Sequence, residues 1–389
     1  MKRILSLSMA AVMALSLAAC GSTDSSSKAG TTETGATAEG AAASSEITGI
    51  AQVCDVGTID DESFNQGCWT AVEAYGEANG IETNYYLPPS EDANDEDRQT
   101  LIRNAVNDGA NTVVCVGYLY GPSLAWAATE YPDVHFIAVD VTVGDIGTET
   151  IPANVYCITY KEEQAGYLAG YAAVKDGLTE LGFLGGMAVP AVIRFGYGFV
   201  QGADAAAQEM GTNVNINYWY GGSFSGSADI TAKMESWYSA GTQAVFACGG
   251  GIYTSAVEAA VKYNGKVIGV DVDQNYIGVE DVEAGKYSYN PFLTSAMKGL
   301  SEGVTDALEH VAAGTWDTIA GTNGVYGLQE GDYVGLPTAE DSWNFSTFTV
   351  EEYEAEVEKI RSGEIVVDNN SDDGTKPVTS DYVKVDYQV

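Results

Sequence analysis

From residue 47 onward, short apolar runs alternate with longer amphipathic stretches, and this alternation restricts the fold more than any other feature of the chain. In the first cycle it predicts strands at 50–56, 82–87, 112–116 and 135–139, separated by helices at 63–79, 98–108 and 121–130. Most of these strand segments are almost continuously apolar, which is typical of parallel strands buried on both faces. Strands and helices that alternate in this way predict a doubly wound α/β unit.

The same rhythm starts again in the second half of the chain. It predicts strands at 153–160, 181–184, 213–220, 244–248 and 266–271, with helices at 162–175, 195–210, 228–240 and 253–263. A strand at 287–294 and helices at 297–312 and 350–363 follow. We therefore expect two lobes: an N-terminal lobe at 47–155, a C-terminal lobe at 156–288, a return segment to the first lobe at 289–325, and a C-terminal segment at 326–389 that completes the second lobe.

The N-terminus has the features of an export signal. Lys2 and Arg3 precede an apolar run at 4–19, which is shorter than the roughly 20 residues of a spanning helix. Cys20 directly follows Leu17-Ala18-Ala19, an arrangement that resembles the bacterial lipobox, in which the cysteine is diacylated. The alternative is a plain secretory signal with an incidental cysteine. We expect a lipoprotein signal peptide at 1–19, lipid on Cys20, and a flexible Ser-, Thr- and Gly-rich tether at 20–46. The protein would then be anchored to the extracytoplasmic face of the cell membrane.

Charge and motif content exclude several classes of protein. The chain carries 17 Lys and Arg against 55 Asp and Glu, and a field of this sign repels nucleic acid. The cysteines beyond Cys20 have no metal-ligand spacing and no CxxC pair, so we expect neither a metal nor a cofactor. The two histidines, His135 and His310, stand near no nucleophile motif, and GxSxG, HExxH and the phosphate loop are absent from the sequence. The sequence therefore favours a binding protein over an enzyme.

Two doubly wound lobes bind ligands beyond the carboxyl ends of their strands, so the segments after the strands are the candidate site. After the first predicted strand, residues 55–65 read DVGTIDDESFN. Asp61 or Ser63 can cap the next helix, which is the structural alternative for one of them. Helix capping alone does not require Phe64 and Asn65 at the next two positions. An aromatic side chain such as Phe64 can stack on a planar ring, and an amide such as Asn65 can hydrogen-bond to it.

This segment resembles the DxxSFN motif of the basic membrane protein family of ABC-transporter substrate-binding lipoproteins, which includes purine-nucleoside receptors. Further segments match in order: YPDVHF at 131–136 leading to Asp140, EQAGYLAG at 163–170, GFLGGM at 182–187, RFGYGF at 194–199, GGG at 249–251, IGVDVDQ at 268–274 and TSAMK at 294–298. The resemblance covers roughly 51–308 and implies a type I periplasmic-binding-protein fold with two lobes joined by a hinge. Gly226 departs from the family, which often has Asp there, and the acidic tail from Asp368 has no counterpart.

The resemblance also implies roles for individual residues. Phe64 and either Phe195 or Phe199 would sandwich a purine, Asn65 would read the ring edge with one donor and one acceptor, and Asp140 would accept from a ring N–H. Asp271 and Lys298 would hold the ribose, and Gly249 and Gly250 would let backbone N–H groups approach the ligand. Asp61 completes the predicted ligand-binding set. Some of these roles have structural alternatives: Phe195 or Phe199 could belong to the core, the glycines could form a turn, Asp271 could cap a loop, and Lys298 could be a surface cation.

These expectations describe a lipid-anchored receptor that captures a nucleoside, preferably a purine nucleoside, and delivers it to an ABC transporter permease. Riboflavin or another small ligand is the alternative cargo. A sensor that reports ligand occupancy to a partner is the alternative role, because both roles need a closing cleft.

Overall fold

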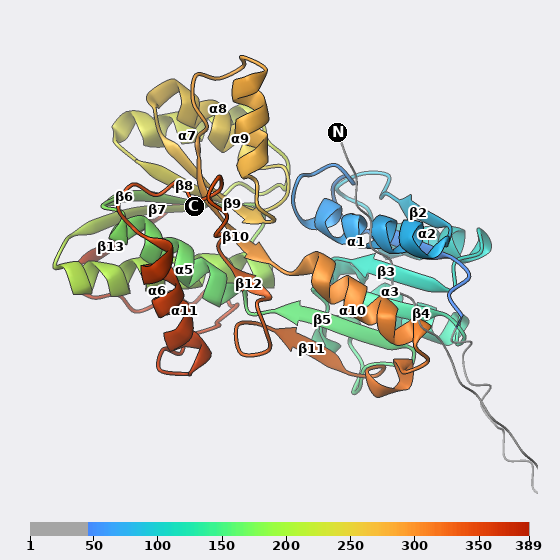
Figure 1. Cartoon of the computed structure of the whole chain (residues 1–389). Helices are drawn as coiled ribbons and strands as arrows, with labels where there is room; N and C mark the ends of the chain where they lie inside the picture. Colours follow the sequence, from blue (N-terminus) through green and yellow to red (C-terminus); the bar gives the residue numbers. More distant parts are fainter. Residues whose placement is uncertain (1–45, 389) are drawn as a thin grey trace, which may run out of the picture. The chain divides into compact units, whose positions relative to one another are not determined.

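The first lobe is built on a six-stranded sheet in the order β11-β5-β4-β3-β1-β2, in which every strand pair is parallel (Figure 1). The computed structural model describes residues 46–388. The strands are β1 (Ile50–Cys54), β2 (Thr83–Tyr86), β3 (Thr112–Val116), β4 (His135–Val139), β5 (Val155–Tyr160) and β11 (Asn323–Tyr326).

Helices cover both faces of this sheet because successive strand residues point to opposite sides. Val114 and Val116 of β3 share one apolar cluster with α1 (Phe64–Asn79) and α10 (Leu300–Ala312). Val113 and Cys115 belong to a second cluster with α2 (Asp95–Asn107) and α3 (Gly121–Glu130). Both faces are buried, which explains why the central strands are mostly apolar.

The second lobe contains a seven-stranded sheet in the order β12-β10-β9-β8-β6-β7-β13. Its strands are β6 (Glu180–Gly185), β7 (Val214–Tyr220), β8 (Ala244–Cys248), β9 (Lys266–Asp271), β10 (Phe292–Lys298), β12 (Val334–Gly335) and β13 (Val383–Tyr387). Within this sheet β12 pairs antiparallel with β10, and the other pairs are parallel. The helices α5 (Glu162–Lys175) and α6 (Pro190–Met210) pack on one face, and α7 (Ala228–Ala240) and α8 (Tyr253–Tyr263) on the other. The fold is therefore the expected two-lobed α/β architecture.

Glycines bring α5 and α6 into unusually close contact. A Cβ atom at Gly166 or Gly170 would lie 2.1 Å from a carbonyl oxygen of α6, that of Phe195 or Phe199 respectively. A Cβ atom at Gly202 would lie 1.8 Å from the carbonyl oxygen of Tyr167. Only glycine permits backbones to approach this closely. Gly166 and Gly170 of the EQAGYLAG segment therefore serve helix packing, as does Gly198 of the RFGYGF segment, where a Cβ atom would lie 2.0 Å from the carbonyl oxygen of Glu163.

The lobe boundaries differ from those expected at 155/156 and 288/289. Strand β5 hydrogen-bonds with β4 and β11 in the first sheet, and β10 pairs with β9 in the second. The chain crosses between the lobes after these strands, at Lys161 and at Gly299, and again between β11 and β12. The expected boundaries placed β5 in the same lobe as α5, and β10 in the same lobe as α10. They were wrong because the chain changes lobe between β5 and α5 and between β10 and α10.

Shorter elements complete the fold. They are the helices α4 (Val143–Ile146), α9 (Asn275–Glu283) and α11 (Val350–Arg361), with single 3-10 turns at Tyr118–Tyr120 and Trp316–Thr318. Helix α2 begins at Asp95, earlier than the expected start at residue 98. Asn94 caps this start by accepting hydrogen bonds from the backbone N–H groups of Glu96 and Asp97.

The predicted signal peptide, lipidated Cys20 and most of the tether lie outside the described residues. Within residues 46–388, no helix combines the length and the apolar character needed to cross a bilayer.

Candidate functional site

A cavity of about 330 Å³ lies where the carboxyl ends of the two sheets meet. Asp55, Gly117 and Asp140 follow strands β1, β3 and β4 of the first lobe, and Cys248 and Asp271 end strands β8 and β9 of the second. Nine of the ten predicted ligand-binding residues line this cavity: Asp61, Phe64, Asn65, Asp140, Phe195, Gly249, Gly250, Asp271 and Lys298. The position of the cavity follows the rule that doubly wound sheets bind ligands at their strand ends.

Asp61 organises the start of α1. Its carboxylate accepts hydrogen bonds from the backbone N–H groups of Ser63, Asn65 and Gln66, each at 3.0 Å. Burial raises the pKa of Asp61 to about 6, although these three hydrogen bonds act to lower it. Both of its oxygens are used by the backbone, so Asp61 has the capping role and presents Phe64 and Asn65 to the cavity.

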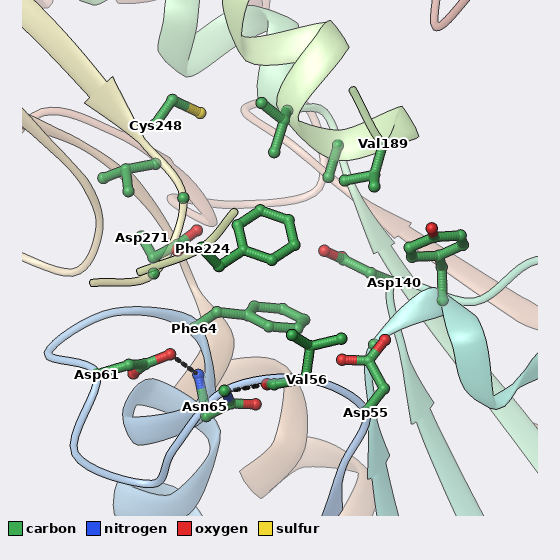
Figure 2. Close-up of a pocket in the computed structure, with 18 of the residues that line it drawn as sticks. Asp55, Val56, Asp61, Phe64, Asn65, Asp140, Val189, Phe224, Cys248 and Asp271 are labelled. Carbon is green, nitrogen blue, oxygen red and sulfur yellow. Dashed lines mark hydrogen bonds between the residues drawn. The ribbon is translucent and has the colours of Figure 1, made fainter. Parts of the chain in front are cut away.

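The buried amide of Asn65 offers the cavity an acceptor. Its Nδ2 donates to the carbonyl oxygen of Val56 at 2.9 Å, as Figure 2 shows. Its Oδ1 is buried without a hydrogen-bond partner in the described part of the chain. The bond to Val56 uses one of the two N–H groups of Nδ2, so Asn65 still has one N–H donor and the unpartnered Oδ1 acceptor, which is the pair that the sequence predicted.

Lys298 is the centre of a buried ionic cluster rather than a surface cation. Its Nζ lies 2.7 Å from Asp140 Oδ2, 3.6 Å from Asp271 Oδ1 and 3.7 Å from Glu162 Oε1. Burial acts to lower the pKa of Lys298, but the three carboxylates outweigh burial and raise the pKa above its ordinary value. Glu162 also binds Arg194, whose Nε lies 2.6 Å from Glu162 Oε2. Both cations that line the cavity are therefore already paired with carboxylates.

The two strand-end aspartates share an uncommon backbone conformation. Asp140 has φ of 59° and Asp271 has φ of 68°, both in the left-handed region that few residues other than glycine adopt. Asp140 Oδ1 is buried without a hydrogen-bond partner in the described residues. Asp271 Oδ2 instead accepts from the hydroxyl of Ser63 in the first lobe at 2.5 Å. Left-handed backbone at such sites is held by its surroundings, and here it turns both carboxylates toward Lys298.

Aromatic rings line the cavity from both lobes. Phe64 is half-buried, and Phe224 of the second lobe lies above its ring in the view of Figure 2, with the Asp140 carboxylate pointing toward both. Phe195 also lines the cavity, and its ring lies 5.9 Å from Lys298 Nζ. Phe199 is fully buried in the core, where its ring packs 5.4 Å from that of Phe246, and it does not reach the cavity. Of the two phenylalanines of α6 that could have stacked on a ligand, Phe195 lines the cavity and Phe199 does not.

Gly249 and Gly250 both have positive φ, 136° and 50°, and line the cavity beside Phe224. A Cβ atom at Gly249 would lie 2.8 Å from the Phe224 ring. The glycines therefore provide both the turn after β8 and the space that Phe224 occupies. A Cβ atom at Gly226 would lie 2.1 Å from Thr254 Oγ1, so a side chain at this position would require Thr254 to move.

Sequence reasoning missed Asp55, Tyr118 and Phe224, which also line the cavity. Asp55 follows β1, so its place at a strand end was the available signal. Burial raises the pKa of Asp55 to about 7, opposed by the hydrogen bond that it accepts from Leu119 N–H. Phe224 lies in a loop after β7 that has no regular periodicity, so only the tertiary structure could reveal its position.

Residues 46–388 contain no group of three or more His, Cys, Asp or Glu side chains able to hold a metal ion. The cysteines in this part of the chain, Cys54, Cys68, Cys115, Cys157 and Cys248, are free and buried.

Comparison with known proteins agrees with this geometry. Residues 49–371 match the family described as ABC transporter substrate-binding protein PnrA-like. The chain is 30% identical over 351 residues to the ABC transporter nucleoside-binding protein BmpA of Lactococcus lactis, covering 87% of this chain and 92% of that protein. It is 31% identical over 380 residues to a CD4+ T-cell-stimulating antigen of Listeria innocua, covering 93% and 97%. Basic membrane protein A of Borreliella burgdorferi is 27% identical, covering 84% and 90%.

Solved structures support the fold alone. A solute-binding protein of an ABC transporter system from Aeropyrum pernix superposes with a TM-score of 0.69 at 21% identity, covering 84% of this chain and 94% of that chain. A corresponding protein from Conexibacter woesei gives a TM-score of 0.63 at 24% identity, covering 83% and 99%. The role rests instead on the family description and on the printed name of the Lactococcus lactis relative, both of which are those of binding proteins, and this fits the expectation that the chain is not an enzyme.

Proposed function

Because this chain belongs to the PnrA-like family of ABC transporter substrate-binding proteins, we propose that it binds a nucleoside, preferably a purine nucleoside, between its lobes and delivers it to an ABC transporter permease. The observation that carries this proposal is the pair of aromatic rings, Phe64 and Phe224, which line one cavity from opposite lobes. A base that stacks on an aromatic ring gains about 1–3 kcal/mol. Closure of the lobes would bring the second ring onto the base.

The polar groups of the cavity match the donors of a nucleoside. Asn65 Oδ1 and Asp140 Oδ1 are buried acceptors without partners in the described residues. A nucleobase supplies N–H donors. The ribose hydroxyls would donate to Asp271, and a sugar oxygen would accept from Lys298, as the sequence predicted. A ligand that satisfied these acceptors would remove the cost of burying them unpaired, about 1–3 kcal/mol each.

The charges of the cavity favour a nucleoside over a nucleotide. Asp55, Asp140 and Asp271 line the cavity, whereas its cations, Lys298 and Arg194, are already paired with carboxylates. A phosphate would therefore meet carboxylates without a free cation to bind it.

The predicted lipoprotein signal is the basis for proposing an extracytoplasmic site of action. We expect lipid on Cys20 to hold the protein at the cell membrane, where a permease would receive the ligand. Labelling cells with radioactive palmitate and comparing the protein with a Cys20→Ser variant tests this expectation. Loss of label and release of the variant into the medium would support it, and unchanged labelling would contradict it.

Calorimetric titration tests the binding proposal. The described residues form one compact unit, so a soluble form without residues 1–20 keeps the whole cavity. After refolding to remove co-purified ligand, it is titrated with inosine, guanosine, adenosine, cytidine, riboflavin, ribose and guanosine 5′-monophosphate. We expect micromolar or tighter binding of purine nucleosides, with ribose and the monophosphate much weaker. Binding of riboflavin alone would contradict the nucleoside and identify riboflavin as the ligand. Binding of ribose alone would contradict the stacking of a base on Phe64 and Phe224.

Two phenylalanine variants provide a matched pair. Phe64→Ala removes a ring that lines the cavity, so affinity should fall on the order of tenfold. Phe199→Ala removes a ring of the same size from the core, so it should lower the free energy of unfolding by about 3–5 kcal/mol and leave the affinity of the folded protein unchanged. Equal effects of both variants on affinity would show that the cavity is not the binding site.

A further inference from the structure

The chain beyond α11 returns to the ligand cavity. Ser371, which lies in an irregular segment between α11 and β13, lines the cavity although no other residue beyond Lys298 does so. The family match extends to residue 371, so Ser371 is the last residue that it covers and the chain after Ser371 lies beyond the match. This contribution to the cavity is visible only in the tertiary structure, because Ser371 is distant in sequence from the other residues that line it.

Side chains of α6 hold both ends of this segment, which we call the rim segment and define as residues 368–380. At its start, Gln201 Nε2 donates to the carbonyl oxygen of Asp368, and Gln201 Oε1 accepts from Asp368 N–H, each at 2.9 Å. At its end, Asp204 Oδ1 accepts from Ser380 N–H at 3.0 Å and from the Ser380 hydroxyl at 2.6 Å. Two anchors three residues apart on one helix fix where the rim segment begins and ends.

Further contacts fix the rim segment to the second lobe. Val367 is buried directly before it, and β13 follows it as the edge strand paired with β7. Within the segment, Lys376 Nζ lies 4.7 Å from the centre of the Tyr387 ring, within the range of a cation–π contact. The first turns of α6 line the cavity, and its later turns hold the rim segment through Gln201 and Asp204. Helix α6 therefore connects the cavity to the rim segment.

We propose that the rim segment is a wall of the ligand site and that the Ser371 hydroxyl contacts the bound ligand and contributes to its specificity. This proposal rests on the function proposed above. A serine hydroxyl supplies one donor and two acceptors, so it can bind a hydroxyl of ribose or a polar edge of a base. Gln201 acts as a positioning residue, because it holds the start of the rim segment three residues before Ser371.

The first experiment measures nucleoside affinity in three variants of the soluble form by calorimetric titration. Ser371→Ala should weaken binding about fivefold, the value expected for one lost hydrogen bond. Ser239→Ala is the matched control, because Ser239 is an exposed residue near the end of α7 that does not line the cavity, and it should leave affinity unchanged. Gln201→Ala should weaken binding to a similar extent because it releases the rim segment.

A double variant separates positioning from a general structural effect. If Gln201 acts through Ser371, adding Gln201→Ala to Ser371→Ala should cause little further loss of affinity, so the two effects should not add. Fully additive losses, or unchanged affinity in both single variants, would overturn the proposal. Failure of the unaltered protein to bind any nucleoside would instead contradict the proposed function, so the two failures are distinguishable.

A fluorescent label provides a second readout that does not depend on losing affinity. The cysteines in residues 46–388 are buried and free, so Ser371→Cys places a single accessible thiol at the cavity in that part of the chain. A polarity-sensitive fluorophore on this variant should change its emission when the nucleoside is added, while the same label on Ser239→Cys should not. An unchanged signal at position 371 in a protein that still binds would contradict contact between the rim segment and the ligand.

Discussion

Asp140 and Asp271 occupy the same place in the two lobes, yet they have different partners. Each follows or ends a strand, each has a left-handed backbone, and each faces Lys298. Asp140 forms the direct ion pair at 2.7 Å and keeps one oxygen without a partner in the described residues. Asp271 is 3.6 Å from Lys298 and accepts a hydrogen bond from Ser63 across the cleft.

The difference shows that strand-end position supplies a carboxylate and that tertiary contacts decide what it does. The partnerless oxygen of Asp140 is suited to a ligand donor. Asp271 is suited to join the lobes, since Ser63 belongs to the first lobe and Asp271 to the second. The variants below separate these roles.

The largest effect should come from Lys298→Met, which removes the cation that both aspartates face. The variant leaves buried carboxylates without their cation, and breaking a buried ion pair costs about 3–5 kcal/mol of the free energy of unfolding. Urea denaturation at pH 8 measures this loss. Lys262→Met is the control, because its ion pair with Glu235 is exposed and should cost at most about 1 kcal/mol. Equal losses in the two variants would contradict a structural role for the buried cluster.

Asp140→Asn should weaken nucleoside binding on the order of tenfold, because a hydrogen bond to a charged acceptor contributes about 1.5–3 kcal/mol. Asparagine tolerates the left-handed backbone at this position, so the change tests charge rather than conformation. Calorimetric titration measures the affinity. Asp133→Asn, an exposed residue before β4, should leave affinity unchanged. If Asp140→Asn left the affinity unchanged, Asp140 would not be a hydrogen-bond acceptor for the ligand.

Asp55 is a third carboxylate that follows a strand, but unlike Asp140 and Asp271 it has no ion-pair partner within residues 46–388. Burial raises the pKa of Asp55 from an ordinary value of 3.8 to about 7. The folded state therefore holds this proton more tightly than the unfolded state does. The stability that it contributes is fully present below about pH 4 and is lost as the pH rises through about 7.

Comparison of the unaltered protein with Asp55→Asn tests this pH dependence. The free energy of unfolding of the unaltered protein should fall relative to that of the variant between pH 4 and pH 8, by on the order of 1 kcal/mol or more. Urea denaturation at each pH measures the difference. A constant difference across this range would mean that Asp55 does not titrate there.

The smallest effect should come from Ser63→Ala, which removes the hydrogen bond between the lobes and leaves Asp271 in place. Loss of one hydrogen bond should weaken nucleoside binding about threefold to fivefold and increase the radius of gyration of the ligand-free protein in small-angle scattering. Asp271→Asn should cause a larger loss of affinity if Asp271 also binds the ligand, as the sequence predicted. Equal losses would limit Asp271 to joining the lobes.

Strand and helix positions were predictable where local pattern and local capping agree. The expected strand at 112–116 is β3, and the expected helix at 228–240 is α7, which Ser227 caps by accepting from Ile230 N–H. The strand expected at 287–294 is instead β10, which continues to Lys298. The polar Ser295 and Lys298 look unsuited to a buried strand, and only their buried partners, Gln274 N–H for Ser295 and the carboxylate cluster for Lys298, explain why they belong to it.

Short edge strands were not predictable because their own residues do not favour them. The strand β12 spans only Val334–Gly335, and β11 is a four-residue segment that contains a glycine. Each forms by hydrogen-bonding with a neighbouring strand that is distant in sequence, β10 and β5 respectively. Such pairing energy is absent from any local window of the sequence.

The sequence by itself determined the two α/β lobes, the acids at the strand ends and the Phe64-Asn65 pair at the start of α1, because periodicity and strand-end position are local properties of the chain. Only the tertiary structure decided that Phe224 and not Phe199 reaches the cavity, that the chain changes lobe at Lys161 and Gly299, and that Ser371 lines the cavity. The physical reason is that a cavity between two sheets is defined by which surfaces meet, and those surfaces come from residues as far apart in the chain as Asp55 and Ser371.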